Sequence, residues 1–543
     1  MNHKVHHHHH HIEGRHMSPY AAPVRDHAGN LRDYLLAAGK ATPDKPAIVE
    51  PAEDGGLRFV SYRQLEAQAD AYAAELDALG LDVGDRVVLE SPATADAVAA
   101  FLACFSLGLP FIPTIPETPV QRLRTIIGMA APALFLQAAD GSREGLPPGL
   151  GMARFGPKGV TTEQLPAPRV RRRRQVVETD PAYLIFTSGT TGRPKGVVMS
   201  HRANIAFHRG IRAHGLIGPD DRVAVTSPFS FDFCLGGIAL TLASGATAVP
   251  VPRDRLDFPR RFLAFLHEAA ITQVHGVPSL WRPLIRHEPD LVAGLDPLRS
   301  ILFSGEDFPL GDLRELQGLL PGRRIFNLYG ATESMAASVT DVPDPLPADL
   351  ERLTIGYAHH GAEMDVYDAE GAPVGEPGVV GEIYLRSPAL FSGYWADPEA
   401  TRAALVPDPL LPESGQVVFR TGDLAYRDAD GRLYFCGRID SQVQIRGNRV
   451  ELGEVERRLR EFPGVSGAVA LVAPAGEGEP ELSAFLTMRP GAPAPKLVPL
   501  RAFCAETLPE YMAPRSLTVL AELPVTTNGK IDKDALLRAR TAR

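Results

Sequence analysis

The amino-acid sequence predicts an α/β fold: a large N-terminal domain with two doubly wound sheets and a β-rich subdomain, followed by a small α+β C-terminal domain. The chain has 543 residues. A chain of this length is too long to fold around a single hydrophobic core, which indicates two or more domains. Strand patterns alternate with helix patterns in two successive runs, an order typical of parallel sheets with right-handed crossovers. Beyond Gly356 short strands and turns replace this alternation, and a compact α+β segment begins near Ser441.

The first alternating run lies between residues 31 and 113. Leu65, Ala69, Tyr72 and Leu76 are spaced at i, i+4, i+7 and i+11, so they lie on one face of a helix, and Ser61 is suited to cap its N-terminus. We therefore expect helices at 31–39, 61–79 and 94–107, and strands at 45–49, 86–90 and 111–113.

The second alternating run lies between residues 222 and 276. There we expect strands at 222–226, 246–251 and 273–276, and helices at 237–244 and 258–269. Later strands are expected at 364–367, 381–386, 467–473 and 482–488, with helices at 452–462 and 501–507. Between the two runs, residues 146–174 are rich in Pro and Gly and lack periodicity, which predicts a linker.

Composition excludes several classes of protein. Residues 1–17 contain six consecutive histidines and a cleavage string and are an expression tag outside the fold. The net charge of −9 argues against a nucleic-acid binder. The sequence contains no run of 18 apolar residues, so we expect no transmembrane helix. The sequence contains four cysteines that lie far apart: Cys104, Cys234, Cys436 and Cys504. We therefore expect them to be small buried hydrophobic residues of a cytoplasmic protein rather than disulfides or zinc ligands.

The most informative stretch is Tyr183 to His201, YLIFTSGTTGRPKGVVMSH. Two apolar strand patterns flank a loop rich in glycine and hydroxyl groups, and Ser200 lies where a helix N-cap would. Glycine lets the backbone approach a ligand, and successive N–H groups with hydroxyls and a lysine suit a polyphosphate. The spacing differs from a Walker A loop. The candidate phosphate-binding residues are Thr187, Ser188, Gly189, Thr190, Thr191, Gly192 and Lys195.

Later stretches carry further candidate residues. Asn327 to Glu333, NLYGATE, offers an aromatic ring, a close backbone approach and a carboxylate. The stretch FRTGDL at 419–424 places a carboxylate after a turn, and GRID follows at 437–440. Near the C-terminus, Asn528-Gly529 predicts a tight turn that projects Lys530.

Together and in this order, these stretches resemble the signatures of adenylate-forming enzymes: acyl- and aryl-CoA ligases, luciferases and peptide-synthetase adenylation domains. The resemblance covers nearly all of the chain outside the tag. It implies that the protein uses ATP and Mg²⁺. It also implies that Asn327 and Tyr329 hold adenine, that Thr332 contacts the α-phosphate, and that Glu333 binds Mg²⁺, a hard cation that requires oxygen ligands.

The same resemblance assigns roles to C-terminal residues. Asp423 would hold both ribose hydroxyls, and Arg438 would contact the nucleotide. Gly447 would line a channel for a pantetheine arm, although Gln444 stands where many relatives carry lysine. Lys530 would be catalytic, because a compact cation can stabilise the charge that develops as a carboxylate attacks the α-phosphate.

The resemblance further implies two domains that change their orientation between half-reactions. An adenylation core would span residues 18–439, and a small mobile domain would span residues 440–543. Asp440 would be the hinge between them.

Asp232 indicates which acid is activated. An unpaired carboxylate among aromatics such as Phe231 is costly, and amino-acid-activating relatives pair such an aspartate with the substrate ammonium; the alternative is a helix-capping aspartate. Gly236 lies one turn further on the same face, where relatives usually carry a bulky side chain, which predicts room for a long substrate. Other predicted pocket residues are Ser304, Gly305, Gly330 and Ala331.

The chain ends about a dozen residues after Lys530, so we expect no fused carrier domain. It resembles free-standing enzymes that load amino-acid starter units, including β-amino acids, onto separate carrier proteins in macrolactam polyketide pathways. A β-amino acid with a medium-chain aliphatic tail is the expected substrate. The alternatives are a free-standing α-amino-acid carrier ligase and an acyl-CoA ligase. A catalytically inactive nucleotide-binding regulator is disfavoured because Lys195, Glu333, Asp423 and Lys530 are all present.

A basic run comprises Arg169 and Arg171 to Arg174. We interpret it first as part of a solvated linker. The alternative is a docking patch that, with Arg446 and Arg449, contacts an acidic carrier protein.

Overall fold

The computed structural model describes residues 29–187, 194–305, 307–445, 448–473, 481–508, 510–526 and 530–541. The chain divides into two compact units. Unit 1 runs to Met364 and includes Leu385–Phe419, whereas unit 2 contains Asp365–Tyr384 and everything from Arg420 onward. The hinge at Asp440 stays a prediction.

The first eight-stranded sheet of unit 1, sheet A, has the order β15-β14-β13-β12-β10-β11-β1-β2. Its inner strands are parallel, and only the edge strands β2 and β15 are antiparallel to their neighbours. The strands are β1 (Pro46–Pro51), β2 (Leu57–Ser61), β10 (Arg222–Val225), β11 (Thr247–Pro250), β12 (Gln273–Gly276), β13 (Ser300–Ser304), β14 (Arg324–Tyr329) and β15 (Ser338–Asp341).

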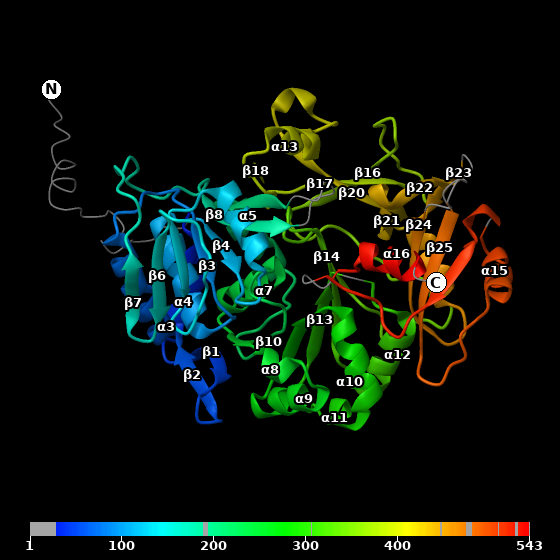
Figure 1. Ribbon diagram of the computed structural model, residues 1–543, viewed down its shortest axis with the longest axis horizontal. Helices are drawn as coiled ribbons and strands as arrows, with labels where there is room; N and C mark the ends of the chain where they lie inside the picture. Colours follow the sequence, from blue (N-terminus) through cyan, green and yellow to red (C-terminus); the bar gives the residue numbers. More distant parts are fainter. Residues whose placement is uncertain are drawn as a thin grey trace. The chain divides into compact units, whose positions relative to one another are not determined.

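Helices cover both faces of sheet A because its side chains alternate between the faces. Ile301 and Phe303 join a core formed with α9 (Pro259–Glu268), α10 (Trp281–His287), α11 (Pro289–Ala293) and α12 (Leu310–Leu319); these helices lie beside β13 and β14 in Figure 1. Leu302 and Phe326 instead pack with residues of α6 (His201–Arg212) and α7 (Asp232–Ala243). The short α8 (Arg253–Leu256) precedes α9.

Sheet B, also in unit 1, has the order β18-β9-β8-β4-β3-β5-β6-β7. Its faces are covered by α5 (Val120–Ala130), which packs on Val88 and Phe135, and by α4 (Ala95–Leu107), whose Phe101 stacks on Phe111. The strands are β3 (Val87–Glu90), β4 (Phe111–Thr114), β5 (Leu134–Ala138), β6 (Gly151–Gly156), β7 (Gly159–Gln164), β8 (Pro181–Thr187), β9 (Lys195–Ser200) and β18 (Gly393–Tyr394). The two sheets confirm the predicted α/β class.

Local sequence signals place several helix starts correctly. The first helices are α2 (Leu31–Leu36), followed by a short 3-10 turn, and α3 (Tyr62–Asp77). Ser61 caps α3 in a capping box with Gln64, and all four residues of the predicted apolar face of α3 are buried. Ser200 caps α6 by accepting a hydrogen bond from the N–H of Ala203.

The prediction of a linker at residues 146–174 is wrong for much of this segment. Strands β6 and β7 form a hairpin there, and β6 adds to sheet B parallel to β5. Ala153 and Phe155 point into the core, whereas Met152 and Arg154 are only half-buried. This alternation marks a strand, but it spans too few residues between glycines to stand out from a loop.

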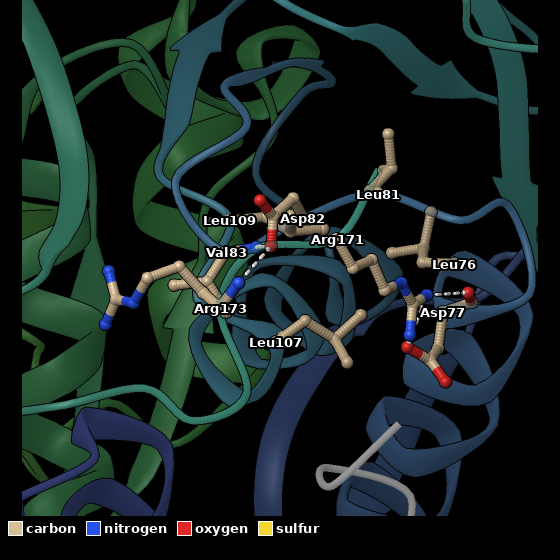
Figure 2. Close-up of a pocket in the computed structure, with 9 residues that line it drawn as sticks. All are labelled: Leu76, Asp77, Leu81, Asp82, Val83, Leu107, Leu109, Arg171 and Arg173. Carbon is tan, nitrogen blue, oxygen red and sulfur yellow. Dashed lines mark hydrogen bonds and ion pairs between the residues drawn. The ribbon is translucent and has the colours of Figure 1, made fainter. Parts of the chain in front are cut away.

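The basic run at residues 169–174, which we call the arginine strap, is tied to unit 1. Its arginines pair with carboxylates of the same unit: Arg169 with Asp85 at 3.3 Å, Arg171 with Asp77 at 2.9 Å, and Arg173 with Asp180 at 2.9 Å. Figure 2 shows Arg171 extended towards Asp77 beside a small pocket that contains none of the predicted site residues. Residues 172–174 are nevertheless exposed and form neither helix nor strand, so the solvated segment predicted here is confirmed, although ion pairs tie it to its own unit.

The remaining elements connect and build unit 2. In unit 1, α13 (Pro398–Ala404) precedes β19 (Leu405–Pro407), which pairs with the first residues of β20 (Val417–Arg427). In unit 2, the rest of β20 pairs with β21 (Leu433–Arg438), and the Thr421 hydroxyl donates to the carbonyl of Ile383 in β17 (Gly381–Arg386). Strand β16 (Glu363–Tyr367) precedes β17.

The C-terminal part of unit 2 is an α+β segment, as predicted. Val455 and Leu459 of the predicted helical face are buried against its sheet. Its elements are β22 (Gln442–Ile445), β23 (Asn448–Glu451), α14 (Leu452–Arg460), β24 (Val465–Ala473), β25 (Glu481–Met488), α15 (Leu497–Ala505), β26 (Ser516–Val519) and α16 (Lys533–Thr541).

The four cysteines all lie within the described residues and form no disulfide. Cys104, Cys234 and Cys504 are buried, and Cys436 is partly exposed. Burial raises the pKa of Cys104 and of Cys234 to about 12. Across the described ranges, every helix is too short or too polar to cross a bilayer.

Candidate active site

The predicted phosphate loop is held between two paired strands of sheet B. Thr187, at the end of β8, lies opposite Lys195, at the start of β9. Most residues of both strands are buried, in agreement with the apolar sequence on either side of the loop. Five of the candidate residues, Ser188, Gly189, Thr190, Thr191 and Gly192, lie outside the described residues. The described pair fixes where the loop leaves and re-enters the sheet.

The second predicted loop follows β14 and is tightly closed. Asn327 and Tyr329 are on the strand, and the N–H of Ala337 donates to the carbonyl of Tyr329 at 2.6 Å. A Cβ atom on Gly330 would lie 2.4 Å from the Cα of Ala336, so only glycine fits. Met335 has a φ of 65°, a left-handed conformation that is strained for a residue with a side chain. This closure projects the residues between these points, Ala331, Thr332 and Glu333, out of the strand.

Asp232 lies in the first turn of α7, one residue after the helix N-cap Phe231. Its carboxyl accepts hydrogen bonds from first-turn backbone N–H groups and from the side chain of Thr332. Burial, and to a smaller extent the negative charge of Glu333, together raise the pKa of Asp232 to about 6, although the hydrogen bonds oppose this shift. Helix capping, the alternative role of Asp232, accounts for its contacts with the backbone of α7. It does not account for the contact with Thr332, which belongs to the loop after β14.

The two adjacent glycines of α7 differ in their surroundings. A Cβ atom on Gly236 would have no heavy atom within 4 Å, whereas one on Gly237 would lie 3.1 Å from Nδ1 of the buried His275. Gly236 thus faces open space and Gly237 faces the core. At the end of β13, Ser304 is partly exposed and Gly305 is exposed with a φ of 91°; a Cβ there would lie 3.6 Å from Val277.

Tyr394 is a residue of the site that the motifs did not indicate. Its hydroxyl donates to Oε2 of Glu333 at 2.8 Å, and the ammonium group of Lys195 lies 4.9 Å from the centre of its ring. It belongs to β18, a strand of only two residues, so no periodicity in the sequence could predict that it pairs with β9.

Three of the candidate residues of unit 2, Asp423, Arg438 and Asp440, form a cluster. Arg438 pairs with Asp423 at 3.0 Å and with Asp440 at 3.1 Å. It also donates to the carbonyl of Thr421 at 3.0 Å, so the two carboxylates share one guanidinium. Lys530 is exposed, and its N–H donates to the hydroxyl of Thr526. Gly447 and the predicted turn at 528–529 lie outside the described residues, and Gln444 is on β22.

The donor set suits a divalent cation that arrives with phosphate oxygens. Mg²⁺ is commonly held by one or two carboxylates together with substrate phosphates and waters. Glu333 offers a carboxylate beside the hydroxyl-bearing Thr332, and one of its oxygens is already oriented by Tyr394. Among the described residues, no group of three or more His, Cys, Asp or Glu could hold a metal by itself. The residues therefore fit Mg²⁺ bound with a nucleotide.

Comparisons with known proteins cover most of the chain. The family model described as AMP-binding enzyme matches residues 35–395. The L-proline–[L-prolyl-carrier protein] ligase of Streptomyces coelicolor is 34% identical over 518 residues, which are 90% of this chain and 92% of that protein. Phosphinothricin tripeptide synthetase PhsC of Streptomyces viridochromogenes is 34% identical over 540 residues, which are 96% of this chain.

The relatives differ in length and identity. The chain spans only 47% of PhsC and 21% of a dimodular nonribosomal peptide synthase of Bacillus subtilis. Among solved structures, the crystal structure of CmiS6 is 99% identical, with a TM-score of 0.76; the match covers 78% of this chain and 100% of that one.

Proposed function

The chain belongs to the AMP-binding enzyme family, and we propose that it activates an amino acid with ATP as the aminoacyl adenylate and then transfers the aminoacyl group to the phosphopantetheine thiol of a separate carrier protein. The printed name of the Streptomyces coelicolor relative, a ligase that joins an amino acid to a carrier protein, supports this class. So do the site residues present in this chain.

The observation that carries the proposal is the position of Asp232. Its carboxyl lies beside Thr332 and Glu333 in an environment that raises its pKa to about 6. A carboxylate that is costly to ionise gains most from a cationic partner. A substrate ammonium bound there would place its own carboxylate near the loop that carries Thr332. Plain fatty acids and aryl acids offer no such cation.

The proposed chemistry has two steps. In the first, a substrate carboxylate oxygen attacks the α-phosphorus of ATP and pyrophosphate leaves. Thr332 contacts the α-phosphate, Glu333 holds Mg²⁺, and Lys195 and Lys530 offset negative charge on the phosphates. Mg²⁺, when bound, supplies charge neutralisation to the phosphate oxygens. In the second step, the carrier thiol attacks the acyl carbon and AMP leaves.

We further propose that the substrate is a β-amino acid with a medium-chain aliphatic tail. The open space beside Gly236 supports this substrate, because a longer chain could occupy the volume that a bulky side chain would fill. The alternatives are an α-amino acid for carrier loading and a plain fatty acid for CoA loading.

ATP–pyrophosphate exchange separates these substrates. The panel should contain α-amino, β-amino and unsubstituted acids of matched length, followed by loading assays with carrier protein and with CoA. We expect the fastest exchange with a medium-chain β-amino acid and transfer to the carrier. Faster exchange with the matched α-amino acid would overturn the β assignment, and faster exchange with the plain acid would overturn amine recognition by Asp232.

A further inference from the structure

The segment Phe391 to Trp395 joins β9 of sheet B, which begins at the phosphate loop, to the loop after β14 of sheet A. The N–H groups of Ser392 and Trp395 donate to the carbonyls of Val198 and Gly196 on β9, at 2.8 and 2.7 Å. The N–H of Phe391 donates to the carbonyl of Glu333 at 2.8 Å. One short stretch of backbone is therefore fastened immediately after Lys195 and directly at Glu333.

Tyr394 makes the corresponding side-chain contacts. Its hydroxyl donates to one carboxylate oxygen of Glu333, and its ring lies under the Lys195 ammonium. The tyrosine itself is held firmly: its N–H donates to the Thr401 hydroxyl at 2.9 Å, and its ring packs edge-to-face on Phe391 with centroids 4.8 Å apart. A rigid aromatic residue thus contacts both charged side chains of the two loops.

We propose that Tyr394 is a positioning residue, which fixes the Glu333 carboxylate and the Lys195 ammonium relative to one another so that metal and phosphate meet them in a preset arrangement. This inference rests on the proposed function, because it assigns Glu333 to the metal and Lys195 to the phosphates. The hydroxyl occupies Oε2 of Glu333 and leaves Oε1 for a cation. The ring attracts the Lys195 ammonium through its π face, a contact that requires an aromatic residue but no hydroxyl.

This division of labour can be tested with two variants. Tyr394→Phe removes the contact to Glu333 and keeps the ring beneath Lys195. Tyr394→Leu removes both contacts. The matched control is Tyr72→Phe in α3 of the same unit, where the lost hydroxyl donates to the carbonyl of Gly156 at 2.6 Å and contacts neither loop.

The measurement is calorimetric titration of each protein with ATP, once with Mg²⁺ and once with EDTA. The ratio of the two affinities reports how far the metal strengthens nucleotide binding, without any turnover. We expect Tyr394→Phe to lower this ratio about tenfold, in line with a hydrogen bond to a charged group, and to leave metal-free ATP affinity unchanged. Tyr394→Leu should weaken metal-free binding as well, and Tyr72→Phe should alter neither.

A double-mutant cycle completes the test. In a Glu333→Ala background, Tyr394→Phe should cause no further loss of the metal-dependent ratio, because the group through which it acts is gone. An unchanged ratio in Tyr394→Phe, or a loss that persists in the Glu333→Ala background, would overturn the positioning role while the proposed function stands. Failure of the wild-type protein to bind ATP at all would instead contradict the proposed function.

Discussion

The carboxyl group of Asp232, in the first turn of α7, accepts a hydrogen bond from the side chain of Thr332, in the loop after β14. The proposed amine site and the proposed α-phosphate contact are therefore directly linked. Glu333, the next residue, adds a negative charge that raises the pKa of Asp232 beyond the effect of burial. The substrate-free protein consequently carries an electrostatic cost at the point where a cationic substrate would bind.

We predict that Asp232→Asn stabilises the substrate-free protein while impairing amino-acid recognition. The folded-state pKa of Asp232 is raised from 3.8 to about 6, so the folded state binds more protons between these values and wild-type stability falls as the pH rises through this window. At about 1.36 kcal/mol per pKa unit, the variant should gain up to about 3 kcal/mol above pH 6. Chemical denaturation at pH 4 and pH 7.5 measures this gain.

The same variant should raise KM for the amino acid steeply, because losing one member of a buried charge pair costs about 3–5 kcal/mol. Exchange assays with the preferred substrate provide this readout. A variant that is less stable at pH 7.5 than the wild type, with unchanged KM, would show that Asp232 is only a structural helix-terminal residue.

We predict that Gly236→Leu shortens the preferred substrate. Each buried methylene adds about 0.8 kcal/mol, so wild-type exchange should climb from 3-aminobutanoate to longer 3-amino acids until the space is filled. Leucine should occupy that space and reverse the order. Because a Cβ at this position meets no heavy atom within 4 Å, the melting temperature should change little.

The neighbouring Gly237→Leu is the matched control, since it adds the same side chain against Nδ1 of His275. It should lower the melting temperature and depress exchange with every substrate alike. An unchanged length preference in a stable Gly236→Leu protein would mean that Gly236 does not line the pocket.

We predict that Lys530→Ala separates the two half-reactions. Adenylate formation should fall by roughly a hundredfold or more, because a charge-stabilising group aimed at the phosphates is lost. Thiolation of a preformed adenylate should remain largely intact if the small domain turns about Asp440 between the steps. Single-turnover assays of each step provide the comparison, and equal losses in both steps would contradict domain alternation.

We predict that carrier loading weakens as salt rises, whereas exchange without carrier hardly responds. The Debye length is about 10 Å at 0.1 M salt, so an acidic carrier bound through arginines should lose affinity. Arginines of the arginine strap already form ion pairs with their own unit. We therefore expect Arg449, rather than the strap, to contact the carrier. Arg449→Gln should reduce the salt dependence of kcat/KM for the carrier, and Arg171→Gln should lower only stability. The reverse pattern would restore the strap as the docking surface.

We predict that Asp408→Asn destabilises unit 1 by about 2 kcal/mol at neutral pH, because it removes the carboxylate that Arg386 stabilises. Arg386 donates to both oxygens of Asp408 at 2.7 and 2.8 Å, and this contact is the main reason that the pKa of Asp408 falls to about 2. A lowered carboxyl pKa gives stability that is present above pH 4 and lost as the pH falls towards 2.

The difference between wild type and Asp408→Asn in urea unfolding should therefore shrink between pH 4 and pH 2. Asp341→Asn is the control, because its pair with Arg324 is exposed on both sides and should be worth less than about 1 kcal/mol. Equal effects of the two substitutions would show that burial of Asp408 does not strengthen its pair.

The sequence predicted those parts of the fold in which local chemistry and periodicity agree. Ser61 and Ser200 cap helices because their side-chain oxygens reach nearby backbone N–H groups, and the buried strands around the phosphate loop follow from their apolar runs. What it missed depends on contacts between distant segments. The hairpin of β6 and β7 is recognisable only once β5 lies beside it.

The same distinction applies to the site. Asp232 and Glu333 stand out as carboxylates in unusual surroundings, yet their proximity requires the folded positions of α7 and β14. No sequence motif indicated Tyr394, because its place in the site depends on contacts with two residues from other elements, Glu333 and Lys195. The sharing of Arg438 between Asp423 and Asp440 likewise appears only in three dimensions.

The unequal burial of the four thiols has a practical consequence. A thiolate is the reactive form, and burial disfavours it at Cys104 and Cys234, while Cys504 is also enclosed. Cys436, on β21 in unit 2, is the partly exposed one. Brief treatment with a maleimide fluorophore should therefore attach one dye at a defined place in the native sequence. The enzyme carries its own labelling handle on the half of the chain that holds Lys530, and a cysteine-free background is not needed to follow that half during turnover.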